Sequence, residues 1–253
     1  MTTPLKPYSG LYQRESPNPY KISRSAIESF LGCRRCFYLE KRLDIYPAGG
    51  LPFSLNSAVD HLLKKEFDIH RARGEPHPLM KKYGIKAVPL THKDLDQWRS
   101  NPIGVQYYHE KTNLLIFGAV DDVWITPSGE LIVVDYKATS KKGEVSLDAD
   151  WQIGYRRQMD VYQWLLKKNG FKVSRTGYFV YCNGKKDRRA FDGKLEFDVK
   201  ILPYEGSHRW IEGALRDIKR VLNASRIPAY SKDCVDCEYQ QAILTLATGR
   251  PPK

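Results

Sequence analysis

The chain has 253 residues, of which 42% are hydrophobic and 28% charged, so it is long enough to bury a full core. Its 41 basic residues outnumber 29 acidic ones, and the net charge of +12 favours a polyanionic partner, because binding phosphates releases counterions. No apolar run approaches the ~20 residues that span a bilayer, and residues 1–7 lack the apolar segment of a signal peptide, so we expect a cytoplasmic protein.

The first 92 residues are predicted to form an arm followed by helices. Residues 1–20 contain four prolines and no periodic pattern, which predicts an extended or disordered arm. Ser23 or Ser25 is the expected N-cap of the first helix, because a glutamate follows Ser25 three positions later. A second helix is expected over 56–69, where apolar residues recur on one side, and the proline-rich stretch 71–92 predicts loops.

The rest of the chain alternates predicted strands and helices. Apolar runs on either side of Ser128 predict a β-hairpin over about 114–125 and 131–138. Residues 150–169 predict a helix that ends at Gly170. This order favours an α+β or mixed α/β domain. The other expected elements are a short helix at 94–99, strands at 103–110, 176–181 and 195–202, a helix at 207–222 and a short helical tail.

The hairpin carries two aspartates that we expect to face each other. If the turn is centred on Ser128, antiparallel pairing places Asp121 opposite Asp135, with Cβ atoms ~4.5–5.5 Å apart. Two carboxylates at this separation repel unless a cation lies between them, and a hard cation such as Mg²⁺ suits oxygen ligands. Strand alternation places Lys137 on the same face and Tyr136 on the other. An exposed, salt-bridged hairpin is the alternative, but charges that end an apolar run are costly when unpaired.

Three short motifs occur in order along the chain: Gly118-x-x-Asp121, Asp135-Tyr136-Lys137 and Gln158-x-x-x-Tyr162. With this order and spacing the chain resembles the PD-(D/E)XK nuclease superfamily, most closely its RecB-like branch, which includes the CRISPR-adaptation exonucleases with four cysteines. The resemblance implies a restriction-endonuclease-like core, in which a mixed central β-sheet is flanked by helices. It implies a single domain over 21–240, with cysteine-containing helical parts at 22–45 and 224–240 and a tail at 241–253.

The resemblance implies a role for each charged residue of the hairpin. Asp121 and Asp135 would be ligands of Mg²⁺ or Mn²⁺, helped by the backbone carbonyl of Tyr136. Lys137 would be the catalytic lysine, since an ammonium group beside a metal site can orient water and stabilise charge on a phosphate.

A third metal ligand is expected from the helix over 56–69. RecB-like nucleases supply a histidine there in a Gly-x-x-x-His setting, which predicts His61, although Ser57 stands in the place of the glycine. Other branches of the superfamily use a glutamate on this helix, so Glu66 is the alternative.

The helix after the hairpin is expected to line the site. Gln158 and Tyr162 are four residues apart, and Tyr155 lies one turn earlier, so the three share one face. In the RecB-like branch this face touches the phosphates of the scissile strand, whereas ordinary helix packing is the alternative. Aromatic and basic side chains nearby would bind the nucleic acid by stacking and by charge. The predicted nucleic-acid-binding residues are Trp151, Tyr155, Arg156 and Arg157.

Two CxxC pairs, Cys33 with Cys36 and Cys234 with Cys237, lie some 200 residues apart, and Cys182 is left over as a buried thiol. In a cytosolic protein such pairs indicate a metal site and not disulfides. The ligand set fits tetrahedral Zn²⁺ or a 4Fe–4S cluster. The resemblance favours the cluster, although RecB-like nucleases have one early and three late cysteines. Either group would clamp the N- and C-terminal parts together.

Taken together, the sequence predicts a metal-dependent deoxyribonuclease, RecB-like and exonuclease-like, acting on single-stranded or frayed DNA ends. The alternative is a non-catalytic nucleic-acid-binding protein with structural zinc, and an RNase is a third possibility. DNA is the expected partner. Repair, phage replication and CRISPR adaptation all use this fold, and any helicase partner would be a separate chain, since this one carries no helicase motif.

Overall fold

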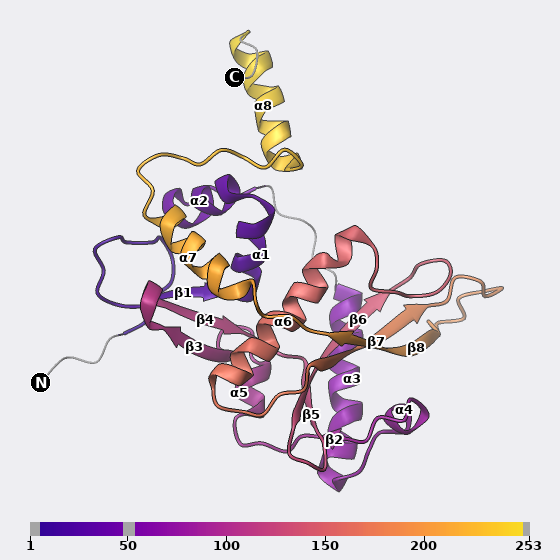
Figure 1. Cartoon of the computed structure of the whole chain (residues 1–253). Helices are drawn as coiled ribbons and strands as arrows, with labels where there is room; N and C mark the ends of the chain where they lie inside the picture. The colour runs from indigo at the N-terminus through magenta and orange to yellow at the C-terminus, as the bar shows by residue number, and fades with distance from the viewer. Residues whose placement is uncertain (1–5, 48–53, 250–253) are drawn as a thin grey trace, which may run out of the picture. The chain divides into compact units, whose positions relative to one another are not determined.

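The computed structural model describes residues 6–47 and 54–249 of the chain (Figure 1). The contacts of the backbone divide the chain into two compact units, which are described separately. The domain boundaries expected from the sequence stay a prediction. Unit 1 comprises Met1–Leu51, Tyr108–Ile116 and Arg209–Lys253, and unit 2 comprises Pro52–Tyr107 and Phe117–His208.

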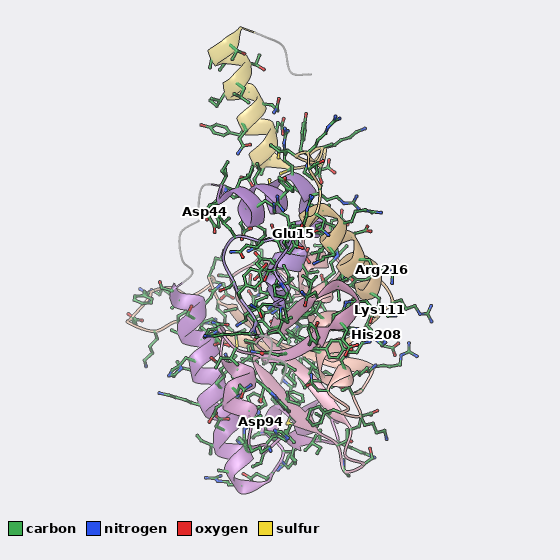
Figure 2. The ribbon with its side chains drawn as sticks, turned by 90° about the vertical axis from the view of Figure 1, so that its left-hand side faces the viewer. Glu15, Asp44, Asp94, Lys111, His208 and Arg216 are labelled. Carbon is green, nitrogen blue, oxygen red and sulfur yellow. The ribbon has the colours of Figure 1, made fainter. Side chains whose placement is uncertain are left out.

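Unit 1 is mainly helical. Ser23 is the N-cap of α1, because its Oγ accepts the N–H of Ala26 at 3.1 Å. The amphipathic helix α7 buries Ile211, Leu215 and Ile218 at helical spacing and packs against α1 and α2. Figures 1 and 2 both place the N-terminal end of α8 beside α2, with the rest of α8 extending away. The elements are β1 (Tyr20–Ser23), α1 (Arg24–Gly32), α2 (Arg34–Leu43), the 3-10 turn η1 (Glu110–Thr112), α7 (Ile211–Leu222) and α8 (Val235–Thr248).

Unit 2 is built on a five-stranded mixed sheet in the order β2-β5-β6-β7-β8. The pair β6–β7 is parallel, and each of the other pairs is antiparallel. The connection between the parallel strands contains α6, as a parallel pair requires a long crossover. The strands are β2 (Val88–Pro89), β5 (Asp122–Ile125), β6 (Leu131–Thr139), β7 (Thr176–Gly184) and β8 (Phe197–Glu205), and the helices are α3 (Ser54–Arg73), α4 (Pro78–Lys82), α5 (Leu95–Arg99), the 3-10 turn η2 (Asp150–Gln152) and α6 (Ile153–Lys168).

The two faces of β6 meet different helices. Trp124, Val134 and Tyr136 belong to a buried cluster with Leu63 and Phe67 of α3. The opposite face carries the side chains that contact α6. The mixed sheet flanked by helices that the sequence predicts is therefore confirmed. In the described part of the chain, no helix is both long and apolar enough to cross a membrane.

The hairpin has the expected register, but its first strand is shorter than expected. Asp122 pairs with Val134 and Val123 with Val133, so the turn is centred on Ser128. The strand expected over 114–125 is interrupted. Its first part is β4 (Leu114–Gly118), which lies in a separate sheet of order β1-β4-β3, with β3 at Val105–His109.

A backbone crossing explains the interruption. Gly104 has φ +64°, and a Cβ atom there would lie 2.4 Å from the carbonyl oxygen of Gly118. Only glycine therefore allows these two backbone segments to cross. Beyond this point Val120 donates its N–H to the carbonyl of Trp98 at 3.0 Å instead of continuing a sheet ladder. The chain therefore re-enters a sheet only at Asp122.

Candidate active site

Asp121 and Asp135 lie at the same end of the hairpin. Asp121 precedes β5 by one residue, and its Oδ2 accepts the backbone N–H of Tyr136 at 2.8 Å. This bond fixes the carboxylate beside β6, next to Asp135. Asp135 itself is fully buried on β6, within the most constrained part of the sheet. The structure therefore brings together the two carboxylates that the sequence pairs.

Lys137 lies on the same face of β6 as Asp135 and is held by three kinds of contact. Its ammonium group forms an ion pair with Asp135 Oδ2 and donates to Gln158 Oε1 at 3.3 Å. It also lies 4.6 Å from the centre of the Tyr155 ring, within the range of a cation–π interaction. The predicted placement of Lys137 beside Asp135, with Tyr136 on the other face, agrees with these contacts.

Gln158 and Tyr162 of α6 connect to this lysine. Gln158 Nε2 donates to the hydroxyl of Tyr162 at 3.0 Å, while its carbonyl oxygen accepts from Lys137. Both side chains are buried. Because the amide is bonded at both its oxygen and its nitrogen, its orientation is restrained, and the Gln158 side chain helps to fix the position of the lysine ammonium group.

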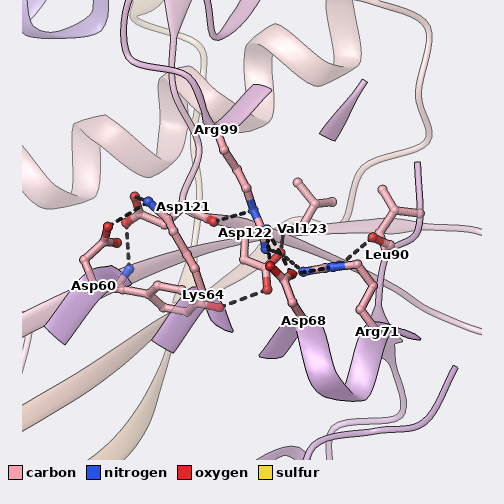
Figure 3. A network of polar contacts seen from close by, with 10 residues as sticks. Asp60, Lys64, Asp68, Arg71, Leu90, Arg99, Asp121, Asp122 and Val123 are labelled. Atoms are coloured by element: carbon pink, nitrogen blue, oxygen red, sulfur yellow. Dashed lines mark hydrogen bonds and ion pairs between the residues drawn. The ribbon is translucent and has the colours of Figure 1, made fainter. Parts of the chain in front are cut away.

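The sequence interpretation missed a third carboxylate, Asp60 on α3. The ammonium group of Lys64 lies 2.8 Å from Asp60 and 3.5 Å from Asp121, and so bridges the two (Figure 3). Burial, and next the charge of Asp121, raise the pKa of Asp60. Burial lowers the pKa of Lys64, but Asp121 and Asp60 outweigh it and the pKa is raised overall. The site already holds a cation between its carboxylates.

The two residues proposed as third ligand are placed differently on α3. His61 is exposed, one position beyond Asp60. Glu66 extends to His77, whose Nε2 lies 2.8 Å from its carboxylate, and is not among the residues brought to Asp121. Asp60 is thus the α3 carboxylate whose charge reaches Asp121, and the assignment of His61 stays a prediction.

Asp122, the neighbour of Asp121, points to the other face of the sheet and is fully buried. Its Oδ1 accepts from Arg71 at 2.5 Å and from Arg99 at 2.9 Å, and its Oδ2 accepts the hydroxyl of Tyr136 at 2.9 Å (Figure 3). Asp68 binds both guanidinium groups from the far side. This set of five residues, the Asp122 network, satisfies a buried charge that would otherwise be very costly.

The Asp122 network also fixes the site residues. Arg99 Nε donates to the carbonyl oxygen of Asp121 at 3.1 Å, which restrains the backbone that carries the site carboxylate. Tyr136 lies between Asp135 and Lys137 in the chain, and its hydroxyl is bound by Asp122. Burial, and next the charge of Asp122, raise the pKa of Tyr136, so this hydroxyl stays protonated and donates. The site residues are therefore held in position by contacts on both faces of the hairpin.

The donor set fits a hard divalent cation. Asp121 and Asp135 lie at one end of the hairpin, Asp60 shares the ammonium group of Lys64 with Asp121, and Lys137 is paired with Asp135. Carboxylate oxygens are the ligands that Mg²⁺ and Mn²⁺ prefer. Because these carboxylates already bind cationic side chains, they have enough negative charge to bind a metal ion.

A basic cleft of about 550 Å³ lies at the carboxyl ends of the parallel strands β6 and β7. Lys141 and Lys142 follow β6, and Lys185 and Lys186 follow β7. Lys185 is paired with an aspartate, whereas Lys141, Lys142 and Lys186 form no ion pair within the described residues. Lys141 lies four positions after Lys137, so their Cα atoms are at most about 14 Å apart. The cleft is within reach of a short strand bound at the site.

The predicted nucleic-acid-binding residues lie at the start of α6 and in the turn before it. Trp151 is 65% exposed, and its ring is 5.6 Å from that of Tyr155 in an edge-to-face arrangement. Tyr155 in turn covers the ammonium group of Lys137. Arg156 and Arg157 are half-buried. The exposed Trp151 ring is therefore joined to the lysine of the site through Tyr155.

The four cysteines of the CxxC pairs come together in unit 1. Their sulfur atoms all lie within 4.8 Å of one another. Burial raises the pKa of the Cys33 thiol, but backbone N–H groups of Cys36 and Ser231, together with neighbouring thiols, outweigh it and lower the pKa to about 6. Cys182 is buried elsewhere, on β7. The arrangement is that of a metal site, as the sequence predicts.

Comparison with protein families identifies the superfamily of the chain. The family model of the PD-(D/E)XK nuclease superfamily matches residues 55–242, well over half of the chain. No curated protein matches it. Nucleases of this superfamily use divalent metals and act on nucleic acid, in agreement with the carboxylate–lysine site. The chain belongs to the PD-(D/E)XK nuclease superfamily.

Proposed function

We propose that the protein is a Mg²⁺- or Mn²⁺-dependent deoxyribonuclease of the RecB-like type. The observation that carries this proposal is the convergence of Asp121, Asp135 and Lys137 on one end of a hairpin, with the lysine held by Gln158. The arrangement has oxygen ligands for a cation and a fixed ammonium group beside them, and both can stabilise charge in the hydrolysis of a phosphodiester.

The proposed metal ligands are Asp60, Asp121 and Asp135, with the backbone carbonyl of Tyr136, and His61 is the alternative to Asp60. A divalent cation bound there supplies charge stabilisation to a phosphate group and lowers the pKa of water. Asp121 keeps its orientation through the Tyr136 N–H, which leaves its other oxygen directed towards Lys64. Hydrolysis at such a site would leave a 5′-phosphate, by resemblance to the family.

Lys137 would orient the attacking water and stabilise charge that builds on the phosphate. Its ammonium group is positioned by Gln158 and covered by Tyr155, so it does not need to reorganise when a substrate arrives. Gln158 and Tyr162 would therefore act on the reaction through the lysine.

The surroundings of the site favour single-stranded or frayed DNA as substrate. Trp151 and Tyr155 offer aromatic faces for an unpaired base, and stacking of this kind is tolerant of sequence. The basic cleft, together with Arg156 and Arg157, would bind phosphates and set no sequence preference. In this proposal an exonuclease-like attack near a DNA end follows from the need for an unpaired strand.

The test is a cleavage assay on linear single- and double-stranded DNA with Mg²⁺ or Mn²⁺. Lys137→Ala and Asp135→Asn should each lower the rate at least ~100-fold, since each removes charge that acts on the transition state. DNA binding should persist, because neither residue belongs to the basic cleft. Lys93→Ala, an exposed lysine of unit 2, is the matched control and should cleave normally.

Undiminished cleavage by both site variants would contradict the proposal. Wild-type protein that binds DNA with strong salt dependence but never cuts it would support the non-catalytic alternative instead. The same assay on an RNA strand of equal length tests the preference for DNA.

A further inference from the structure

The two CxxC pairs occupy equivalent positions on two helices of unit 1. Cys33 is the N-cap of α2 and Cys36 lies in its first turn. Cys234 is the N-cap of α8 and Cys237 lies in its first turn. The pairs therefore present their sulfur atoms from two helix N-termini. The backbone N–H groups at such ends favour negative charge, which suits a cluster of thiolates.

The separations of the sulfur atoms distinguish between the possible metal groups. The Sγ atom of Cys237 lies 3.7 Å from that of Cys33 and 3.5 Å from that of Cys36, and Cys36 and Cys234 are also 3.5 Å apart. Four thiolates around one zinc ion, each ~2.3 Å from the metal, lie about 3.8 Å from one another. In a 4Fe–4S cluster each thiolate binds a different corner of the cube, which separates the sulfur atoms by about 6 Å.

The cluster that the family resemblance suggests therefore does not fit this donor set. All four sulfur atoms lie within 4.8 Å, a span too small to enclose a cube of four irons. Disulfides do not explain the separations either, because a bonded pair would be ~2 Å apart and none of the five cysteines is in a disulfide. We propose that Cys33, Cys36, Cys234 and Cys237 hold a single tetrahedral zinc ion.

One divalent ion bound by four thiolates carries a net negative charge. The basic residues beside the site agree with this. Arg34 and Arg35 open α2 directly beside this charge. Arg34 is also paired with Asp217 of α7 at 3.2 Å, which ties the same turn to the body of unit 1. Soft thiolate ligands select Zn²⁺ over the Mg²⁺ or Mn²⁺ of the carboxylate site, so the two sites would not compete for one metal.

The zinc ion would be the main attachment of α8. Cys237 is the one residue of this 14-residue helix that is buried, and Tyr239, Leu244 and Leu246 are more than half exposed. A helix of this length is marginal on its own in water. Zinc binding would therefore supply the free energy that keeps α8 formed and against α2.

The first experiment is metal analysis of the full chain, purified without oxygen and without added metal. We expect one zinc per chain, no inorganic sulfide and a colourless protein. A chelator should expose four thiols to a thiol reagent, and added Zn²⁺ should protect them again. Four irons with sulfide, one iron without sulfide, or a metal-free protein with four reactive thiols would each overturn the assignment.

The second experiment follows α8 by hydrogen–deuterium exchange. Amides of α8 should exchange at least ten times faster after chelation, and their protection should return when Zn²⁺ is restored. The comparison uses the wild-type chain throughout, so it does not depend on a variant that fails to fold. Cys237→Ser should bind less zinc and lose this protection, whereas Cys182→Ser is the matched control and should keep both. Unchanged exchange of α8 in the chelated protein would contradict the proposed attachment. None of these measurements depends on nuclease activity.

Discussion

The carboxylate site of unit 2 and the cysteine site of unit 1 are built in opposite ways. Asp121 and Asp135 are neighbours in one hairpin, and Lys64 and Lys137 already compensate their charge. The cysteine pairs come from chain segments some 200 residues apart and meet at two helix ends. The first site is held by its own ion pairs, and a metal would add chemistry to it. The second would need its metal in order to hold its elements together.

The largest effect should come from the support beneath the carboxylate site. Asp122→Ala leaves the guanidinium groups of Arg71 and Arg99 buried with only Asp68 to neutralise them, and should lower the free energy of unfolding by about 3–5 kcal/mol. Urea unfolding measures this. Asp68→Ala should cost less, because its side chain is 44% exposed. If both variants lost the same free energy of unfolding, burial of the carboxylate would not be what decides the loss.

Asp60→Asn should separate metal binding from folding in the carboxylate site. It removes one charged oxygen ligand while keeping the shape, so Mn²⁺ affinity should fall by roughly 10–100-fold, the range seen when a ligand's surroundings are perturbed. Titration of Mn²⁺ by calorimetry tests this directly. Asp96→Asn, an exposed aspartate of α5, is the control. Full affinity in Asp60→Asn together with a loss in His61→Ala would return the ligand role to His61.

The smallest effect is expected from the basic cleft. Alanine at Lys141, Lys142 and Lys186 together should leave folding and zinc content unchanged, since these side chains form no ion pair within the described residues. If each contacts one phosphate of a single strand, the slope of log affinity against log salt should fall by about 2. Binding curves at several salt concentrations measure the slope. An unchanged slope would show that the strand takes another path.

The register of the hairpin was predictable because a short turn fixes it. With the turn at Ser128, the register that pairs Asp122 with Val134 and the opposite orientation of Tyr136 follow from strand alternation alone. The shared face of Gln158 and Tyr162 follows in the same way from helical periodicity. These inferences need only local geometry, so they survive in the structure.

Features that depend on contacts distant in the sequence were not predictable. Whether Asp60 or His61 faces the hairpin is decided by a 100° rotation of α3, which packs through only two buried residues and so has a weak sequence pattern. Val120 continues an apolar run. Nothing in the neighbouring sequence shows that its N–H donates to the carbonyl of Trp98 or that the strand ends there. The role of Asp122 depends on Arg71 and Arg99, which come from two other helices.

The pair Asp121–Asp122 makes the chain intolerant of insertions and deletions at one point. Alternation sends these neighbours to opposite faces, so a change of one residue between Asp122 and the turn at Ser128 would place the site carboxylate among the buried arginines and the other in the site. Both catalysis and folding would be lost in one step. The segment 141–143 follows β6 and carries no such constraint, so length variation among related chains should be concentrated there.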